Sequence, residues 1–404
     1  MHSILKITSC SLFAEEIIFH ESTADNFCVT GLLPLLRAAA LGQEDFDPTL
    51  LDDSTIAWAI RAGLGPLMWR LGQKRLAITK TGALHDSLRS ADLVAKLTVA
   101  ETLDALEEIL SAAPEISQEI TLLKGVSICQ RHYPTPHLRT MGDIDLLVPQ
   151  AKQAPLESLL SQLGYCQQSN RPAEFYRTHH HSMPYFHPAR HVWVEVHTAL
   201  LSNRNVAADP VFSSTHIVSQ IVPTTFRGYK TNRLSDELDM VYLAAHWALE
   251  RRCFAGGAMP CVDMMYLITT RGQELNWEQI LISLEGCTAA TYIFLMLGFL
   301  NTHEIITLPD GFLERLTEVQ RYPLAGNEAI LHGLIDKYCM RGIPFGKITT
   351  EANIGILWET LLIPGPAWKN LIRAPGDILF PPQDKRRFNF AFQVGRISRA
   401  LGFR

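Results

Sequence analysis

The chain has 404 residues, of which 47% are hydrophobic and 19% are charged, and its formal net charge is -5 from 36 basic and 41 acidic residues. This balance is typical of a folded globular protein and excludes a largely disordered chain. It also excludes a strong overall attraction for nucleic acid or acidic lipid, so we expect neither as a partner. A chain of this length is expected to divide into two or three domains.

The eight cysteines are scattered, and none forms a C-x-x-C pair, so the sequence indicates neither a zinc ribbon nor a disulfide framework. Reduced thiols fit a cytoplasmic protein, which is the localisation we expect. The first residues lack the long apolar stretch and the small-residue cleavage site of a secretory signal. The longest apolar run, 289–300, is shorter than the roughly twenty residues that a membrane-spanning helix needs.

The first part of the chain is predicted to be mainly helical. Residues 1–29 indicate at most a short strand or a docking arm, and helices are expected from Gly31 and from Ile56. The clearest helix is predicted over 92–110, where apolar residues recur at three- and four-residue steps, and Pro114 ends it. These apolar residues are Leu93, Leu97, Ala100, Leu103, Leu106 and Leu110.

From about residue 115 the pattern changes to short strands and helices, which predict a compact α/β unit. Strands are predicted at 120–123, 143–148 and 192–197, a hairpin turn at 185–188, and helices at 126–133 and 154–163. Further helices are predicted at 235–249, 261–270, 277–284 and 288–300. We therefore expect a helical N-terminal region (1–114), an α/β core (115–232), a helical domain (233–304) and a helical extension with a basic tail (305–404).

Two carboxylates, Asp143 and Asp145, stand at the start of the predicted strand 143–148. Side chains alternate along a strand, so both carboxylates point to the same face. Two like charges held so close repel each other unless a cation lies between them, and Mg²⁺ prefers such oxygen ligands. Asp-x-Asp is frequent by chance, so the alternative of a turn followed by a solvated strand stays open, and the context decides.

Three other features accompany this pair. Lys124-Gly125 follows a strand, where glycine allows close approach to a phosphate and lysine adds a point charge. Glu195 and His197 share one face of the strand 192–197, so Glu195 can complete a metal site. Arg139 is placed to hold a phosphate or a carboxylate. The alternative for each charged residue is a structural ion pair.

In this order, the motifs resemble the nucleotidyltransferase (polymerase beta-like) superfamily, and more narrowly the bacterial family known as uncharacterised nucleotidyltransferase. That family typically has Leu-Lys-Gly, then Arg, then Asp-Ile-Asp-Leu-Leu-Val, and later an acidic residue two before a histidine. The matching residues here are Leu123–Gly125, Arg139, 143–148, Glu195 and His197. Better-known superfamily members have Gly-Ser instead of Lys124-Gly125, so the grip on the nucleotide is expected to differ.

The resemblance implies an α+β fold, in which a small mixed β-sheet core carries flanking helices and a helical C-terminal region. It implies transfer of a nucleoside monophosphate from an NTP to a hydroxyl or similar acceptor on a small molecule or peptide, as in natural-product tailoring or resistance. The alternatives are an inactive binding protein with this fold, or a toxin-like transferase acting on tRNA. The last would need a basic acceptor groove, which the net charge of -5 does not indicate.

The resemblance also implies roles for individual residues. Asp143, Asp145 and Glu195 would hold two Mg²⁺ ions as the catalytic group, and Glu195 is a candidate general base. Lys124, Gly125 and Arg139 would bind the nucleotide, and His197 would contact the substrate or support the carboxylates. We expect Asp143→Asn and Asp145→Asn to abolish transfer and leave the fold intact.

Several other residues are tempting metal or catalytic candidates, but their patterns disfavour such roles. The histidines at 179, 180, 181, 187 and 191 suggest zinc, yet no cysteine stands at ligand spacing and the stretch is predicted to be a loop. His246 and Asp263 match a histidine-bearing and an acidic helix of the family. Both lie on predicted amphipathic helices, so we expect them to make helix–helix hydrogen bonds.

Overall fold

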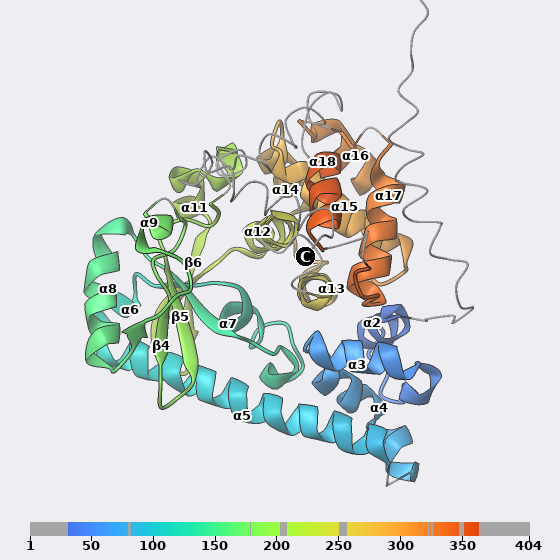
Figure 1. Ribbon diagram of the computed structural model, residues 1–404. Helices are drawn as coiled ribbons and strands as arrows, with labels where there is room; N and C mark the ends of the chain where they lie inside the picture. The colour runs from blue at the N-terminus through green and yellow to red at the C-terminus, as the bar shows by residue number, and fades with distance from the viewer. Residues whose placement is uncertain are drawn as a thin grey trace, which may run out of the picture.

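The structure is a computed structural model that describes residues 31–79, 82–177, 179–202, 208–249, 257–321, 323–324, 326–346 and 351–362. The expected N-terminal arm and the basic tail lie outside these ranges. Figure 1 shows a sheet at one side of the molecule and a helical part at the other, with the long helix α5 running along both. The chain is therefore α+β with a helical region, as predicted.

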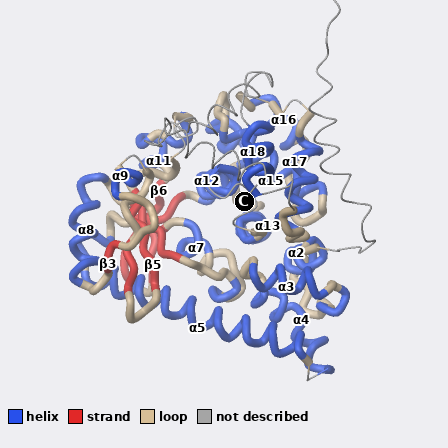
Figure 2. The backbone as a smooth tube through the Cα atoms, viewed as in Figure 1, coloured by secondary structure: helices blue, strands red, loops and turns tan. Residues whose placement is uncertain are grey.

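A seven-stranded mixed sheet has the strand order β3-β4-β5-β2-β1-β7-β6 (Figure 2). The strands are β1 (Thr121–Leu122), β2 (Asp143–Leu147), β3 (Cys166–Gln167), β4 (Tyr185–His187), β5 (Val192–His197), β6 (Ile221–Phe226) and β7 (Tyr229–Leu234). Strands β2 and β5 are parallel neighbours in the sheet. Strand β4 pairs antiparallel with β5, so residues 185–187, predicted to form a hairpin turn, form a strand of the hairpin instead.

The hairpin β6–β7 was not predicted, and it extends the sheet beyond β1. Its two-residue turn has positive φ at Arg227 (47°) and Gly228 (91°), the geometry that joins twisted antiparallel strands. Pro223 lies within β6, where proline argues against a strand unless the strand is at an edge. Strand β6 is the edge of the sheet, so the proline is tolerated there.

Helices precede, interrupt and follow the sheet. Those before it are α2 (Leu33–Ala40), α3 (Asp53–Arg61), α4 (Gly65–Thr79), α5 (Ala83–Ala112) and α6 (Pro114–Ser117). Those between its strands are α7 (Lys124–Ile128), α8 (Gln150–Gln162), α9 (Ala173–Tyr176) and α11 (Ser214–Ser219). Those after it are α12 (Asp236–Leu249), α13 (Met259–Arg271), α14 (Trp277–Leu284), α15 (Ala289–Thr302), α16 (Phe312–Val319), α17 (Glu328–Leu334) and α18 (Glu351–Leu362).

The buried face of helix α5 differs from the apolar stripe predicted for it. Leu93 and Leu97 are 49% and 73% exposed, whereas Ala95 and Val99 face inward. The reason is that α5 serves two cores: its beginning contributes Leu88 to the helical core, and its end packs on the sheet. Between these two parts Asp92 and Ala95 are buried, and Ala100 of the predicted stripe is exposed, so the buried face differs from the predicted one. Helix α7 is also shorter than the helix predicted over 126–133: it spans Lys124–Ile128.

The hydrophobic core forms two clusters in the described part of the chain. One cluster lies under the sheet and includes the end of α5, while the other joins the N-terminal helices to those after residue 233. These clusters do not test the predicted domain boundaries. No described helix combines the length and the apolar character that crossing a membrane requires.

Buried ion pairs hold the sheet against the helical part. Arg131, just after α7, donates from Nη1 to Asp236 and from Nη2 to Asp239 at 2.6 Å each, and Asp239 is fully buried. Both carboxylates belong to the first turn of α12. These two contacts join the segment after α7 to the beginning of α12.

Candidate active site

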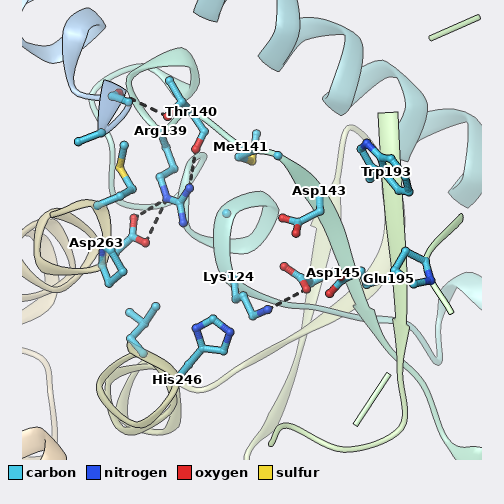
Figure 3. A pocket seen from close by; sticks show the side chains of 18 of the residues that line it. Lys124, Arg139, Thr140, Met141, Asp143, Asp145, Trp193, Glu195, His246 and Asp263 are labelled. Carbon is cyan, nitrogen blue, oxygen red and sulfur yellow. Dashed lines mark hydrogen bonds and ion pairs between the residues drawn. The ribbon is translucent and has the colours of Figure 1, made fainter. Parts of the chain in front are cut away.

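A pocket of about 470 Å³ opens where the sheet meets the helical part (Figure 3). Its walls come from the end of α3, the turn at α7, the loop before β2, strands β2 and β5, and helices α12 and α13. Its charged and histidine side chains are Arg61, Lys124, Arg139, Asp143, Asp145, Glu195, His246 and Asp263. The pocket therefore gathers residues from parts of the chain that are distant in sequence.

Three carboxylates of the pocket come from the two parallel strands. Asp143 and Asp145 share one face of β2, and the register places Asp145 directly opposite Glu195 on β5. Figure 3 shows the three side chains directed to the same region of the pocket. Asp145 is 2% exposed, while Asp143 and Glu195 are half-buried. Parallel pairing thus assembles the carboxylate set that the sequence predicted.

Asp145 is bound from two sides. Its Oδ1 atom accepts from Nζ of Lys124 at 2.9 Å and lies 2.8 Å from Nε2 of His197. Burial opposes the ionised form, but the charge of Lys124 and the hydrogen bond with His197 outweigh burial and hold the pKa of Asp145 well below its usual range. The carboxylate is therefore ionised at neutral pH.

Glu195 lies between two histidines. Its Oε2 atom is 3.6 Å from Nε2 of His197 and 3.5 Å from Nε2 of His181. Burial raises the pKa of Glu195, but the hydrogen bond with His197 together with the charges of His181 and Lys124 lowers this pKa below its usual value. His197 itself is fully buried and does not line the pocket, so it lies behind the carboxylates.

Lys124 has a left-handed backbone, with φ at 49°, which is uncommon for a residue with a side chain. Burial disfavours its charged form, yet Asp145, Tyr242 and the other pocket carboxylates hold its pKa above the usual value. Gly125 follows at the pocket wall, where an added Cβ would lie 2.7 Å from Cγ of Met141. A larger residue at 125 would push Met141 aside, which is a local reason for the glycine.

Arg139 lines the pocket but does not pair with the Asp-x-Asp carboxylates. Its Nε atom donates to Oδ1 of Asp263 at 2.8 Å, and its Nη1 atom donates to the carbonyl of Thr140. Tyr133 donates from its hydroxyl to the same Asp263 oxygen at 2.6 Å. Asp263 is fully buried, so it holds Arg139 at the wall and through it the loop that leads into β2.

The structure thus brings Asp263 and His246 to the pocket, although the sequence indicated only packing for them. Their helical spacing is typical of core residues, and only the likeness to a histidine-bearing and an acidic helix distinguished them. Arg61, Met141 and Trp193 also line the pocket. No sequence signal marked them.

The three consecutive histidines gather behind Glu195, and their imidazole nitrogens lie within 4.8 Å of one another. His180 is hydrogen-bonded through Nδ1 to Ser202, and His181 through Nδ1 to the carbonyl of Ser182 at 2.6 Å. His187 is bound elsewhere, to the carbonyl of Leu163. The five-histidine zinc set considered from the sequence is therefore not assembled as a whole.

A model of the family described as uncharacterised nucleotidyltransferase matches residues 50–303, well over half of the chain. The chain belongs to this family. Searches of curated proteins and of solved structures found no match. The matched range contains every pocket residue, from Arg61 on α3 to Asp263 on α13.

The donor set of this pocket fits a divalent metal. Ligand atoms of Asp145, Glu195 and His197 lie within 4.8 Å of one another, and Asp143 faces the same pocket. Mg²⁺ takes carboxylate oxygens and keeps further positions for water and phosphate. The half-buried carboxylates leave an open side toward the pocket for such ligands.

Gly63, just after α3, contacts Thr140 in the loop before β2, and replacing Gly63 tests this contact. Its φ is 81°, and an added Cβ would overlap Oγ1 of Thr140. We expect Gly63→Ala to cost about 1–3 kcal/mol more than Gly42→Ala, because overpacking adds to the backbone cost. Gly42 has a similar φ of 63° with nothing within 4 Å of the added Cβ.

Urea denaturation of the two variants measures this difference in the free energy of unfolding. Equal losses for Gly63→Ala and Gly42→Ala would contradict the close contact between α3 and the loop before β2.

Proposed function

We propose that this chain transfers a nucleoside monophosphate from an NTP to a hydroxyl or similar acceptor on a small molecule or peptide, in a reaction that requires Mg²⁺. The observation that carries the proposal is the register of β2 and β5, which turns Asp143, Asp145 and Glu195 toward one pocket. The family membership supports nucleotidyl transfer as the reaction class.

In this proposal, the three carboxylates are the ligands of Mg²⁺ and the catalytic group. Mg²⁺ bound there would lower the pKa of the acceptor hydroxyl and balance negative charge on the phosphates. The lowered pKa of Asp145 and of Glu195 supports this role, because a metal ligand has to be ionised.

The remaining pocket residues position the substrates. Attack of the acceptor oxygen on the α-phosphorus forms the new P–O bond and expels pyrophosphate, and it needs in-line positioning more than covalent help. Glu195 would accept the proton of the hydroxyl. Lys124, Gly125 and Arg139 would contact the phosphate oxygens, with Arg139 held in place by Asp263.

The size and charge of the pocket favour a small-molecule or peptide acceptor over tRNA. A volume of about 470 Å³ lies within the usual range for small-molecule sites. Two of the basic side chains that line the described pocket, Lys124 and Arg139, are each bound to a buried carboxylate, which disfavours a role in holding an RNA backbone.

Incubation with each of four α-labelled NTPs, Mg²⁺ and a cell extract tests the proposal, with mass analysis of whatever gains label. We expect one or more NTPs to label a product with the wild-type protein and not with Asp143→Asn. Label on tRNA would show that the acceptor is tRNA and not a small molecule or peptide. No labelled product with any NTP would favour an inactive binding protein.

A further inference from the structure

The Oδ1 atom of Asp145 already has its full set of hydrogen-bond donors. A carboxylate oxygen offers two lone pairs, and here one lies against Nζ of Lys124 at 2.9 Å and the other against Nε2 of His197 at 2.8 Å. Only Oδ2 is left for a metal ion. A carboxylate that bridges two cations usually offers one oxygen to each, so Asp145 is poorly placed to bridge.

The ammonium of Lys124 is built into the site. Its side chain is 12% exposed and its partner Asp145 is 2% exposed, so separating them would leave two buried charges without each other. The left-handed backbone at Lys124 is a strained conformation, and such strain persists where the surrounding structure requires one geometry. The lysine is therefore held against Asp145 by its backbone as well as by its charge.

The charges of the site agree with this arrangement. Asp143, Asp145 and Glu195 carry three negative charges, and Lys124 returns one positive charge. The Lys124 ammonium therefore already places a positive charge against Asp145. A second divalent ion that binds Asp145 through Oδ1 would have to displace Lys124 from that atom.

We propose that the ammonium of Lys124 takes the place of the second metal ion, so that the site binds a single divalent cation with the nucleotide. This inference rests on the proposed function, and it replaces the two ions expected from the superfamily resemblance. The Lys124 ammonium would then contact Oδ1 of Asp145. The divalent cation would bind Oδ2 of Asp145 together with the carboxylates of Asp143 and Glu195.

Mn²⁺ in place of Mg²⁺ allows the number of bound metal ions to be measured without relying on catalytic turnover. The full-length protein is mixed with Mn²⁺ and, in turn, with four α,β-methylene NTP analogues, and bound Mn²⁺ is counted by equilibrium dialysis. Electron paramagnetic resonance then reports whether two ions lie close together, since paired metals about 3.5–4 Å apart couple strongly. The variants are Lys124→Met and Lys124→Arg, with Lys152→Met on α8 as the control.

We expect one uncoupled Mn²⁺ per chain in the wild type, in Lys124→Arg and in Lys152→Met, and two coupled ions in Lys124→Met. Two coupled ions in the wild type, or one ion in folded Lys124→Met, would overturn the inference and leave the proposed function in place. No bound Mn²⁺ with any nucleotide would overturn both. If Lys124→Met does not fold, the wild-type and Lys124→Arg counts decide.

Discussion

Asparagine at position 145 is expected to destabilise the protein and abolish nucleotidyl transfer, whereas asparagine at 143 is expected to abolish transfer alone. Asp145 and Lys124 form a buried ion pair, so removing one charge should lower the free energy of unfolding by about 3 kcal/mol or more. Asp143 is half-buried at the start of β2, so its replacement by the amide is expected to cost less than that of the buried Asp145. Sequence reasoning alone predicted an intact fold for both variants.

Urea denaturation and the labelled-NTP assay separate the two effects. Loss of a residue that merely supports a metal ligand typically costs 10–100-fold, so loss of a ligand should cost more than about 100-fold at either position. Equal stability of the two variants would contradict the buried pair of Asp145 with Lys124. Retained transfer in Asp143→Asn would contradict the carboxylate assignment.

Asp263→Asn is expected to have the second largest effect, because it leaves the Arg139 guanidinium without its carboxylate. The Asp263 side chain is fully buried and that of Arg139 is 15% exposed, so the free energy of unfolding should fall by about 3 kcal/mol. Nucleotide binding should weaken as well, because Arg139 also holds the carbonyl of Thr140 in the loop before β2.

Tyr133→Phe is the matched control for this variant. It removes the hydroxyl that donates to Asp263 and leaves the ion pair with Arg139, so we expect a loss of about 1–2 kcal/mol. Urea denaturation measures both variants. A loss for Asp263→Asn no larger than that for Tyr133→Phe would show that the ion pair does not hold this wall of the pocket.

The sequence predicted the carboxylates of the site because their arrangement follows from local rules. A side-chain period of two places Asp143 and Asp145 on one face, and Glu195 on the corresponding face of another strand. Their meeting also requires that β2 and β5 be parallel neighbours in register, which the strand pattern alone does not contain.

The other walls of the pocket depend on contacts that no local pattern encodes. Arg139 and Asp263 are 124 positions apart, and each is compatible with an ordinary surface or core role in its own segment. The exposed Leu93 and Leu97 of α5 were mistaken for core residues for a related reason, because periodicity identifies an apolar face and does not say which core it meets.

Binding of a non-hydrolysable NTP analogue, with and without Mg²⁺, tests most directly whether the carboxylate pocket is a metal-dependent nucleotide site. Isothermal titration calorimetry should compare the wild type with Asp143→Asn, whose fold is expected to be unchanged. We predict saturable binding of at least one analogue that requires Mg²⁺ and is lost in Asp143→Asn. Binding that is indifferent to Mg²⁺ and to Asp143, or no binding of any analogue, would contradict the proposed function.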